Sequence, residues 1–441
     1  MTNIKISFTS LGCSKNLVDS EIMLKLLTDS GFSIVEDIHA DVAVINTCAF
    51  IGSAKQEAID TILDIAWLKE NRELKGIIVT GCLAERYRDE IMTELPEVDA
   101  VVGVGSIKRI TEAVKAVLNG DKTIIADDAA SLELGGERLL TTPSYMAYLK
   151  IAEGCDNCCT YCVIPSIRGR YRSREMSDVL AEAKSLADQG VREICVVAQD
   201  TTKYGLDLYS ELRLPELVRE IAKIDGLYWI RLFYCYPDGI TDELVAVIRD
   251  EDKVVKYIDM PIQHISDKIL SSMNRRGGAD VIRSAISRLR QNVPGIAIRT
   301  TVITGFPGET DEDFDVLLNF IKETKFERLG AFAYSAEEGT PAERFQDQVD
   351  EQLREKRRDA VMETQSYVSE KYNESKLKTT IKVLYEGFDV VAECHFGRSQ
   401  HDSPEIDGKI YFTTNDELKI GDFVNVKITE VLDYDLLGET C

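Results

Sequence analysis

Short apolar strands alternate with helices along most of the chain, and this alternation constrains the fold more than any other feature of the sequence. Within residues 1–120, the runs KISFTSLG, VAVINT and GIIVTG are β-rich and suited to burial on both faces, as strands of a parallel sheet are. The segment NLVDSEIMLKLLTDSG between the first two predicts a helix with Asn16 as its N-cap and Gly31 as its stop. We therefore expect an N-terminal α/β domain with a parallel sheet over residues 1–120.

Six further strands are expected from about residue 147, with helical segments such as SDVLAEAKSLADQG between them. Their expected positions are 147–154, 192–200, 228–237, 257–264, 297–305 and 329–335. Six βα units in succession over 141–375 predict a partial (βα)6 barrel of the TIM type, with its site at the C-terminal ends of the strands. The irregular stretch 119–144 is expected to be the connection into this barrel.

Beyond the barrel strands a long charged helix is expected over 342–375, and the pattern then changes. Short strands separated by turns are predicted at 379–387, 390–397, 408–413 and 421–432. They indicate a small all-β barrel over residues 376–441. The expected fold class is therefore α/β, with an N-terminal parallel-sheet domain, a central partial barrel and a C-terminal β-barrel.

The composition, with 44% hydrophobic and 29% charged residues, indicates a globular protein. The longest apolar runs are only as long as strands, far below the roughly 18 residues of a membrane span, and the N-terminus is unlike a signal peptide. We therefore expect a cytoplasmic protein whose eleven cysteines stay reduced and serve as metal ligands or core residues. The net charge of −24 disfavours nucleic acid and favours a basic protein partner, although acidity that only maintains solubility explains it equally well.

Four cysteines lie within eight positions in EGCDNCCTYCVIP (153–165), directly after the first expected barrel strand. One interpretation is C-x2-C-C-x2-C, for zinc or an all-cysteine cluster, but a tetrahedral zinc site usually has two ligand pairs separated by a spacer. The other is C-x3-C-x2-C, formed by Cys155, Cys159 and Cys162, with Cys158 as an extra thiol. We favour the second, because three thiolates can hold three irons of a 4Fe–4S cluster and leave the fourth iron open.

Three more cysteines each end an expected strand of the N-terminal domain: Cys13, Cys48 and Cys82. They are 35 and 34 residues apart, about one βα unit each, so the three thiols are expected to meet at the C-terminal edge of the sheet. Taken alone, each of these cysteines is best interpreted as a buried core residue. Because all three come at the end of a strand, we favour a second cluster held by three cysteines, with one open iron. The remaining cysteines have no partner at ligand spacing and are expected to be structural: Cys195, Cys235, Cys394 and Cys441.

An open iron at the end of a barrel suits S-adenosylmethionine, whose amino and carboxylate groups can complete the coordination. Reductive cleavage then yields a 5′-deoxyadenosyl radical, while the protein binds, orients and excludes water. Tyr161, just before the last cysteine of the loop, is expected to cover the adenine, with a core tyrosine as the alternative.

Other contacts to S-adenosylmethionine are assigned by position alone. In VITGFPGE, Gly305 is expected to let the backbone approach the adenosine, and Glu309 to cap the next helix. Gln199, Gln263 and Arg299 are assigned from expected positions at strand ends. His264, beside Gln263, is explained equally well as a structural histidine.

The chain resembles the radical-SAM methylthiotransferase family over nearly its whole length. The resemblance lies in SLGCSKNLVDSE, NTCAF, VTGCLAERY, IAEGCDNCCTYCVIPSIRG and GFPGET, and the last domain resembles the TRAM β-barrel that recognises substrate in that family. It implies two 4Fe–4S clusters. The first, on Cys13, Cys48 and Cys82, would handle sulfur, and the second, on the loop cysteines, would cleave S-adenosyl-L-methionine. A second molecule of that cofactor would supply the methyl group, and an electron donor such as a flavodoxin or ferredoxin is implied.

The family has two branches, one modifying an adenosine of transfer RNA and one the β-carbon of an aspartate in ribosomal protein S-twelve of the small subunit. The segments AQDTTKYGLDLY and YIDMPIQHISDKILSSMNRRG resemble the ribosomal-protein branch, whereas the tRNA branch has a QNVNSY-like segment. Residues 376–441 hold seven Lys/Arg against thirteen Asp/Glu, and this acidity suits a basic ribosomal protein, free or on the ribosome, better than RNA.

Two alternatives remain at this point. One is a tRNA adenosine methylthiotransferase, and the other is a non-catalytic iron–sulfur electron carrier. Cys158 departs from the family, whose members usually have a residue other than cysteine there.

Overall fold

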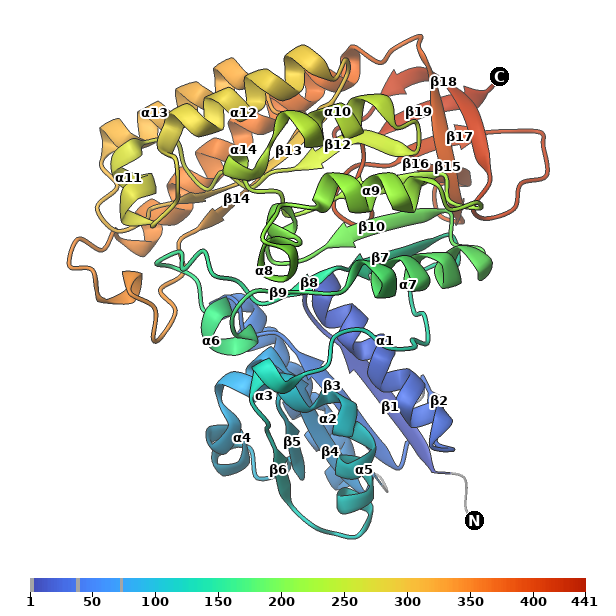
Figure 1. Cartoon of the computed structure of the whole chain (residues 1–441), viewed down its shortest axis with the longest axis vertical. Coiled ribbons are helices and arrows are strands. Elements are labelled where there is room, and N and C mark those ends of the chain that lie inside the picture. The colour runs from blue at the N-terminus through green and yellow to red at the C-terminus, as the bar shows by residue number, and fades with distance from the viewer. Residues whose placement is uncertain (1–3, 37–39, 72–73) are drawn as a thin grey trace.

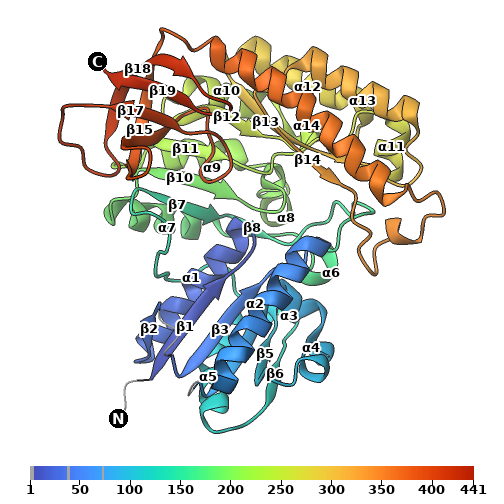
Figure 2. The same cartoon turned by 180° about the vertical axis from the view of Figure 1, so that it is seen from behind.

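The structure is a computed structural model and describes residues 4–36, 40–71 and 74–441. Figures 1 and 2 show a blue N-terminal α/β domain, a green-to-orange layer of strands and helices above it, and a red barrel at one end of that layer. The described residues form two six-stranded sheets, a closed barrel, and a two-stranded ribbon of β8 (Ala152–Glu153) and β9 (Arg172–Ser173). No helix within these residues is long and apolar enough to cross a membrane.

The N-terminal sheet has the strand order β2-β1-β3-β4-β5-β6, and all its pairs are parallel, as the sequence predicted. Its strands are β1 (Lys5–Ser10), β2 (Ser33–Val35), β3 (Val42–Thr47), β4 (Gly76–Gly81), β5 (Ala100–Val102) and β6 (Thr123–Ile125). The helices around it are α1 (Ser14–Asp29), α2 (Gly52–Asn71), α3 (Cys82–Arg86), α4 (Arg88–Glu94) and α5 (Ile110–Leu118). Strand β6 lies in the stretch 119–144, which we had expected to be only a connection.

Helix α1 begins earlier than predicted, and its N-cap is Cys13 rather than Asn16. The Asn16 amide donates instead to the backbone carbonyls of Leu11, at 2.6 Å, and Thr47, at 3.2 Å. These bonds tie the carboxyl ends of β1 and β3 to the first turn of α1. The helix ends at Asp29, close to the predicted stop.

The second sheet has the order β14-β13-β12-β11-β10-β7, again all parallel, which confirms the partial six-stranded barrel. Its strands are β7 (Met146–Lys150), β10 (Glu193–Val197), β11 (Trp229–Leu232), β12 (Val254–Asp259), β13 (Ala297–Thr304) and β14 (Arg328–Ala333). Its helices are α6 (Ile164–Arg168), α7 (Met176–Asp188), α8 (Leu206–Tyr209), α9 (Leu214–Ala222), α10 (Asp242–Asp250), α11 (Asp267–Ser272), α12 (Gly278–Asn292) and α13 (Asp311–Thr324). The largest apolar core lies between these strands and helices.

Helix α14 (Glu351–Glu374) packs on β13 and β14 and leads into the last domain. It starts later than the predicted 342–375, whose first residues form a short 3-10 turn, Ala342–Arg344. The C-terminal barrel closes in the order β15-β16-β17-β19-β18. Its strands are β15 (Thr380–Asp389), β16 (Cys394–Ser399), β17 (Ile410–Thr413), β18 (Phe423–Val431) and β19 (Leu436–Thr440), of which β19 was not predicted.

Buried polar contacts fasten the C-terminal barrel to the amino ends of the second sheet. Arg398 pairs with Glu193, the first residue of β10, at 2.6 Å. Arg328, the first residue of β14, pairs with Asp402 of the loop between β16 and β17. The C-terminal barrel therefore lies at the end of this sheet opposite its carboxyl edge, and that edge stays available to the N-terminal domain (Figures 1 and 2).

Candidate functional site

The cysteines Cys13, Cys48 and Cys82 lie at the carboxyl ends of β1, β3 and β4, which are neighbours in the N-terminal sheet. A Cβ atom on Gly12 would lie 2.8 Å from the Cβ of Cys48, so the backbone beside Cys13 approaches Cys48 too closely for any residue but glycine. The three thiols also act on one another's pKa through their charges. The structure thus brings this trio together at the edge that the sequence predicted.

The four cysteines of the second group, Cys155, Cys158, Cys159 and Cys162, lie on the loop between β8 and α6. Cys155 and Cys159 are buried and Cys162 is partly buried, whereas Cys158 is exposed and has a left-handed backbone with φ 50°. The Cys155 N–H donates to the carbonyl of Gly169 at 3.1 Å, and the Cys162 N–H donates to that of Cys159 at 3.0 Å. The loop is therefore folded back on itself and on the end of α6.

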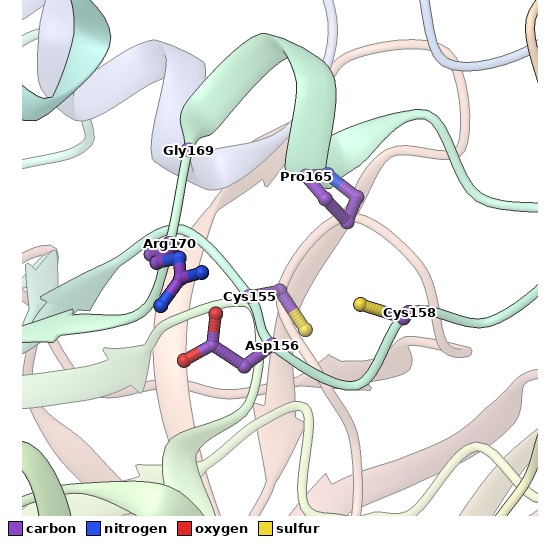
Figure 3. Close-up of a pocket in the computed structure, with 6 residues that line it drawn as sticks. All are labelled: Cys155, Asp156, Cys158, Pro165, Gly169 and Arg170. Atoms are coloured by element: carbon purple, nitrogen blue, oxygen red, sulfur yellow. The ribbon is translucent and has the colours of Figure 1, made fainter.

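A cavity of about 470 Å³, within the usual size of a ligand pocket, opens beside this loop (Figure 3). It is lined by Cys155, Asp156, Cys158, Pro165, Gly169 and Arg170. Figure 3 shows the sulfur atoms of Cys155 and Cys158 pointing toward one another. The Cys158 side chain thus lies beside that of Cys155, and both line the same cavity.

Burial raises the pKa of Cys48 and Cys155 to about 11 and that of Cys162 to about 12. Such thiols stay protonated at neutral pH unless a metal cation takes up the charge of the thiolate. Desolvation also acts to raise the pKa of Cys13, but the positive charges of Lys15 and Arg168 outweigh it and lower that pKa. The donor set is therefore chemically suited to a cationic metal centre.

The number of thiols in each trio bears on which metal centre it can hold. Among the described residues, no group of three or more His, Cys, Asp or Glu side chains is placed to hold one metal ion. In a 4Fe–4S cluster each thiolate binds a different iron, so its ligands need not converge on one point. Three thiolates leave a tetrahedral zinc ion one ligand short, whereas they leave a 4Fe–4S cluster with one open iron.

A buried network of charges joins the two cysteine groups. Arg168, at the end of α6, donates to Asp19 of α1 at 2.6 Å and to Glu153 at 3.3 Å. Lys150 pairs with the same two carboxylates. Arg168 also donates to the Cys82 sulfur at 3.4 Å. Arg168, at the end of the helix that follows the loop of Cys155 to Cys162, thus contacts Cys82 of the N-terminal trio.

We call this contact region the interdomain interface. It consists of Cys13, Lys15, Asn16, Asp19 and Cys82 from the N-terminal domain, with Lys150, Glu153, Arg168 and Tyr234 from the second sheet and its loops. Figures 1 and 2 show the start of α1 beside β8 at this place. The carboxyl edges of both sheets therefore face a common region.

Arg275, in the loop before α12, lies beside the second cysteine group. Its guanidinium is 4.3 Å from the centroid of the Tyr236 ring, and the Tyr236 hydroxyl is 3.7 Å from the Cys159 sulfur. One guanidinium nitrogen donates to the carbonyl of Pro261, while Nη1 is buried and has no hydrogen-bond partner in the described structure. A buried donor without a partner is suited to a polar ligand.

Three residues that were predicted to contact the cofactor, Tyr161, Gln199 and Gln263, lie near the second cysteine group. Tyr161 is on the cysteine loop and packs edge-on against Phe306, with centroids 6.4 Å apart. Gln199 follows β10 and donates to Glu153 at 2.7 Å, and its amide oxygen is buried without a described partner. The amide oxygen of Gln263 is likewise buried and unpaired. These free amide groups, with the Arg275 nitrogen, fit a polar cofactor such as S-adenosylmethionine.

Arg299 does not have the position from which it was assigned. It is the third residue of β13, near the amino end, and pairs with Asp259 at 2.8 Å. Its Nε is 3.9 Å from a carboxylate oxygen of Asp407 in the C-terminal barrel. The expectation that Arg299 ends a strand is therefore wrong. Its close ion pair, with Asp259, lies within the second sheet, and its longer contact, with Asp407, reaches the C-terminal domain.

Gly305 and Glu309 have structural contacts. A Cβ atom on Gly305 would lie 2.3 Å from Cγ of Arg354, so packing of α14 requires glycine at this position. The Glu309 carboxylate accepts from the Gly305 N–H at 3.0 Å and pairs with Arg357 of α14. The predicted cap at Glu309 is wrong, because Thr310 caps α13.

His264 is fully buried, and its Nδ1 accepts from the Ser266 N–H at 2.9 Å. Its Nε2 is 3.4 Å from Glu309. The Nδ1 bond supports the structural interpretation of this histidine, whereas Nε2 has no hydrogen-bond partner in the described structure.

Sequence reasoning missed the charged residues of the interdomain interface. Lys15 and Asp19 lie within SLGCSKNLVDSE, and Arg168 lies within PSIRG, but their burial cannot be seen in a hydrophobic pattern. One signal was present: polar residues three to four positions apart, Asn16, Asp19 and Ser20, share the face of α1 that the cysteine trio also adjoins.

Three family models match the chain in order. They are Uncharacterized protein family UPF0004 over residues 5–103, the Radical SAM superfamily over 149–321, and the TRAM domain over 379–441. Together they cover the N-terminal sheet as far as β5, the second sheet as far as α13, and the C-terminal barrel.

Curated relatives match over nearly the full length. A protein of Clostridioides difficile (strain 630) named Ribosomal protein uS12 methylthiotransferase RimO is 50% identical over 438 residues, covering 99% of this chain and 98% of its own. Proteins with the same name from Thermoanaerobacter sp. (strain X514) and Geobacter sulfurreducens are 49% and 50% identical. The match to the Thermoanaerobacter protein covers 98% of this chain and 99% of that protein, and the match to the Geobacter protein covers 99% and 98%.

Solved structures share the fold at low identity. The radical S-adenosylmethionine methyltransferase TsrM from Kitasatospora setae, described with cobalamin and a 4Fe–4S cluster bound, matches with a TM-score of 0.58 and 16% identity. That match covers 78% of this chain and 77% of TsrM. The cobalamin-dependent S-adenosylmethionine radical enzyme OxsB matches with a TM-score of 0.51 and 12% identity, over 82% of this chain and 56% of OxsB.

Proposed function

The chain belongs to the RimO family of radical-SAM methylthiotransferases, and from this premise we propose that it adds a methylthio group to the β-carbon of an aspartate in ribosomal protein uS12, the S-twelve protein of the small subunit. The observation that carries the proposal is the 50% identity over nearly the whole length to a relative of that name. The two cysteine trios, one on each of two facing sheet edges, support it with the ligands that such chemistry needs.

When bound, two 4Fe–4S clusters and S-adenosylmethionine would carry the sulfur atom, supply the methyl group and abstract hydrogen from carbon. Cys13, Cys48 and Cys82 hold the cluster concerned with sulfur. Cys155, Cys159 and Cys162 hold the cluster that binds S-adenosylmethionine. Four of the six thiols and the surrounding charges are buried away from water, whereas Cys13 is exposed and Cys162 is partly buried.

The other residues of the site bind and orient the cofactor. Tyr161 covers the adenine, while the free amide oxygens of Gln199 and Gln263 and the free nitrogen of Arg275 bond its polar groups. Arg168 fixes the distance between the trios, because it bonds Asp19 and Cys82 of the N-terminal domain from the end of α6. The C-terminal barrel, fastened at the far end of the second sheet, recognises the substrate protein.

Charge supports a protein substrate. The whole chain carries −24 and the last domain is acidic as well, whereas a protein that binds RNA neutralises phosphates with Lys and Arg. An acidic surface attracts a basic ribosomal protein and raises its rate of association. The proposed reductant of the clusters is a flavodoxin or ferredoxin.

The test is an anaerobic assay with reconstituted protein, a chemical reductant and S-adenosylmethionine, offering uS12 and transfer RNA in separate reactions. Mass spectrometry is expected to find a methylthio group on one aspartate of uS12 and none on the RNA, with 5′-deoxyadenosine as a second product. Cys159→Ala is expected to abolish 5′-deoxyadenosine, because it removes a ligand of the cofactor-binding cluster. Cys48→Ala is expected to keep 5′-deoxyadenosine and to lose sulfur transfer.

Modified RNA beside unmodified uS12 would refute the choice of substrate and favour the tRNA enzyme. A reduced protein that forms no 5′-deoxyadenosine would favour an electron carrier. Full product formation by both cysteine variants would refute the assignment of the two trios.

A further inference from the structure

Lys15 is a buried cation at the meeting point of the two sheet edges. It lies in the first turn of α1, two residues after Cys13, and is 8% exposed. Its ammonium nitrogen is 3.3 Å from the centroid of the Tyr234 ring, and Tyr234 follows β11 of the second sheet. The side chain therefore reaches from the edge of the first trio to the carboxyl end of a strand in the other sheet.

Among the described residues, Lys15 has no carboxylate partner in the interdomain interface. In the interdomain interface, the cations Lys150 and Arg168 are matched by the carboxylates of Asp19 and Glu153. Lys15 forms no ion pair with any carboxylate of the described residues, and its partner is the aromatic ring of Tyr234. An isolated buried charge is costly to maintain, and a ring alone compensates it only in part. The interface thus holds one cation more than carboxylates, and this cation also lowers the pKa of the Cys13 thiol beside it.

The partner of Lys15 is itself held in an unfavourable conformation. Tyr234 has φ 56°, in the left-handed region that residues with side chains seldom adopt. Its N–H donates to Asp259 at 3.1 Å, and its carbonyl accepts from the Thr201 N–H at 3.2 Å. These bonds fix the ring under the ammonium group, so the position of Lys15 is built into the second sheet.

We propose that Lys15 receives the carboxylate of the substrate aspartate and makes the site selective for an anionic residue. This inference rests on the proposed function, in which the modified β-carbon is bonded directly to that carboxylate. A carboxylate that leaves water for this buried region needs a cation and a hydrogen-bond donor, and Lys15 offers both. It stands beside Cys13, at the edge assigned to sulfur, where the β-carbon must be presented.

The test measures binding of uS12 to the anaerobic holoenzyme, using uS12 with its modified aspartate and the same protein with asparagine there. Wild-type enzyme is expected to bind the aspartate form about tenfold to a hundredfold more tightly, as for a hydrogen bond to a charged group. Lys15→Met, which removes the charge and keeps the length, is expected to bind both forms equally. Lys15→Arg is expected to retain most of the preference.

The matched control is Lys25→Met on the same helix. Lys25 is paired with Asp29 at 2.6 Å and is far from the trio, so its replacement is expected to leave the preference for aspartate unchanged. Iron and sulfide content is measured in every variant and is expected to equal that of wild type.

Each other result has a distinct meaning. A Lys15→Met enzyme that still prefers the aspartate form would overturn the role of Lys15. Loss of iron in Lys15→Met, restored in Lys15→Arg, would also overturn it, because the lysine would then balance the charge of a cluster. A wild-type enzyme that leaves uS12 unmodified would overturn the proposed function itself, which the separate modification assay detects.

Discussion

Replacing Arg168 by leucine is expected to destabilise the protein by about 3–5 kcal/mol, the usual cost of removing one partner from a buried ion network. Arg168 is 2% exposed and donates to Asp19 at 2.6 Å, Asn16 at 3.1 Å and Glu153 at 3.3 Å. Without it, two buried carboxylates share the single charge of Lys150. At about 2–4 °C per kcal/mol for a domain of this size, the melting temperature is expected to fall by about 6–20 °C.

Two controls separate the ion network from other effects. Arg109 also pairs with two carboxylates, Glu112 at 2.7 Å and Asp127 at 3.1 Å, but its side chain is 43% exposed. Arg109→Leu is therefore expected to have little effect on stability. Cys82→Ser removes a proposed cluster ligand that Arg168 touches and leaves the carboxylate partners intact.

The assay is differential scanning calorimetry of the anaerobic proteins, with iron content measured on the same samples. The transition that contains the N-terminal domain and the second sheet is expected to shift far more in Arg168→Leu than in Arg109→Leu. Equal shifts in these two variants would refute the reasoning from burial. A shift in Arg168→Leu no larger than in Cys82→Ser would attribute the effect to loss of a cluster instead.

Two further predictions follow from single residues of the site. Desolvation acts to raise the pKa of Glu153, but Lys150 and Arg168 outweigh it and lower that pKa to about 2. The carboxylate therefore stabilises the fold fully above its usual pKa of about 4.5 and loses this contribution as the pH falls toward 2. The difference in melting temperature between wild type and Glu153→Gln is expected to shrink over that range, and a constant difference would contradict the prediction. Cys158→Ala is expected to keep the iron content and the formation of 5′-deoxyadenosine, since three other thiols of the loop suffice; loss of about half the iron would make Cys158 a ligand.

The positions of Cys13, Cys48 and Cys82 could be predicted because a regular physical rule connects spacing with location. Parallel strands separated by one βα unit end at the same edge, and β1, β3 and β4 are indeed adjacent. Strand β2 has only three residues, too few to show a pattern in the sequence. The prediction did not need it, because β2 pairs on the outer side of β1 and does not separate β1 from β3.

The errors have a common cause, which is tertiary structure that competes with local preference. Asn16 is a good capping residue, but its amide bonds the ends of β1 and β3 and leaves the cap to Cys13. Glu309 precedes a helix, but its carboxylate is held by Arg357 from a distant helix. Strand β6 has only three residues and depends on its pairing with β5.

The buried charges could not be predicted from the sequence. Lys15, Asp19 and Arg168 are residue types that usually face solvent, and only the fold shows that they meet between two domains. Arg299 is the third residue both of the expected strand 297–305 and of β13, so its assignment to a strand end was wrong. Only the fold shows that it pairs with Asp259 and approaches the C-terminal barrel.

Iron and sulfide analysis of anaerobically purified protein tests the central claim, that each cysteine trio holds a four-iron cluster, most directly. Wild type is expected to hold about eight irons per chain. Alanine replacement of all three of Cys13, Cys48 and Cys82 is expected to leave about four, as is replacement of the other trio. About four irons in wild type, or an N-terminal triple variant with as much iron as wild type, would contradict the claim.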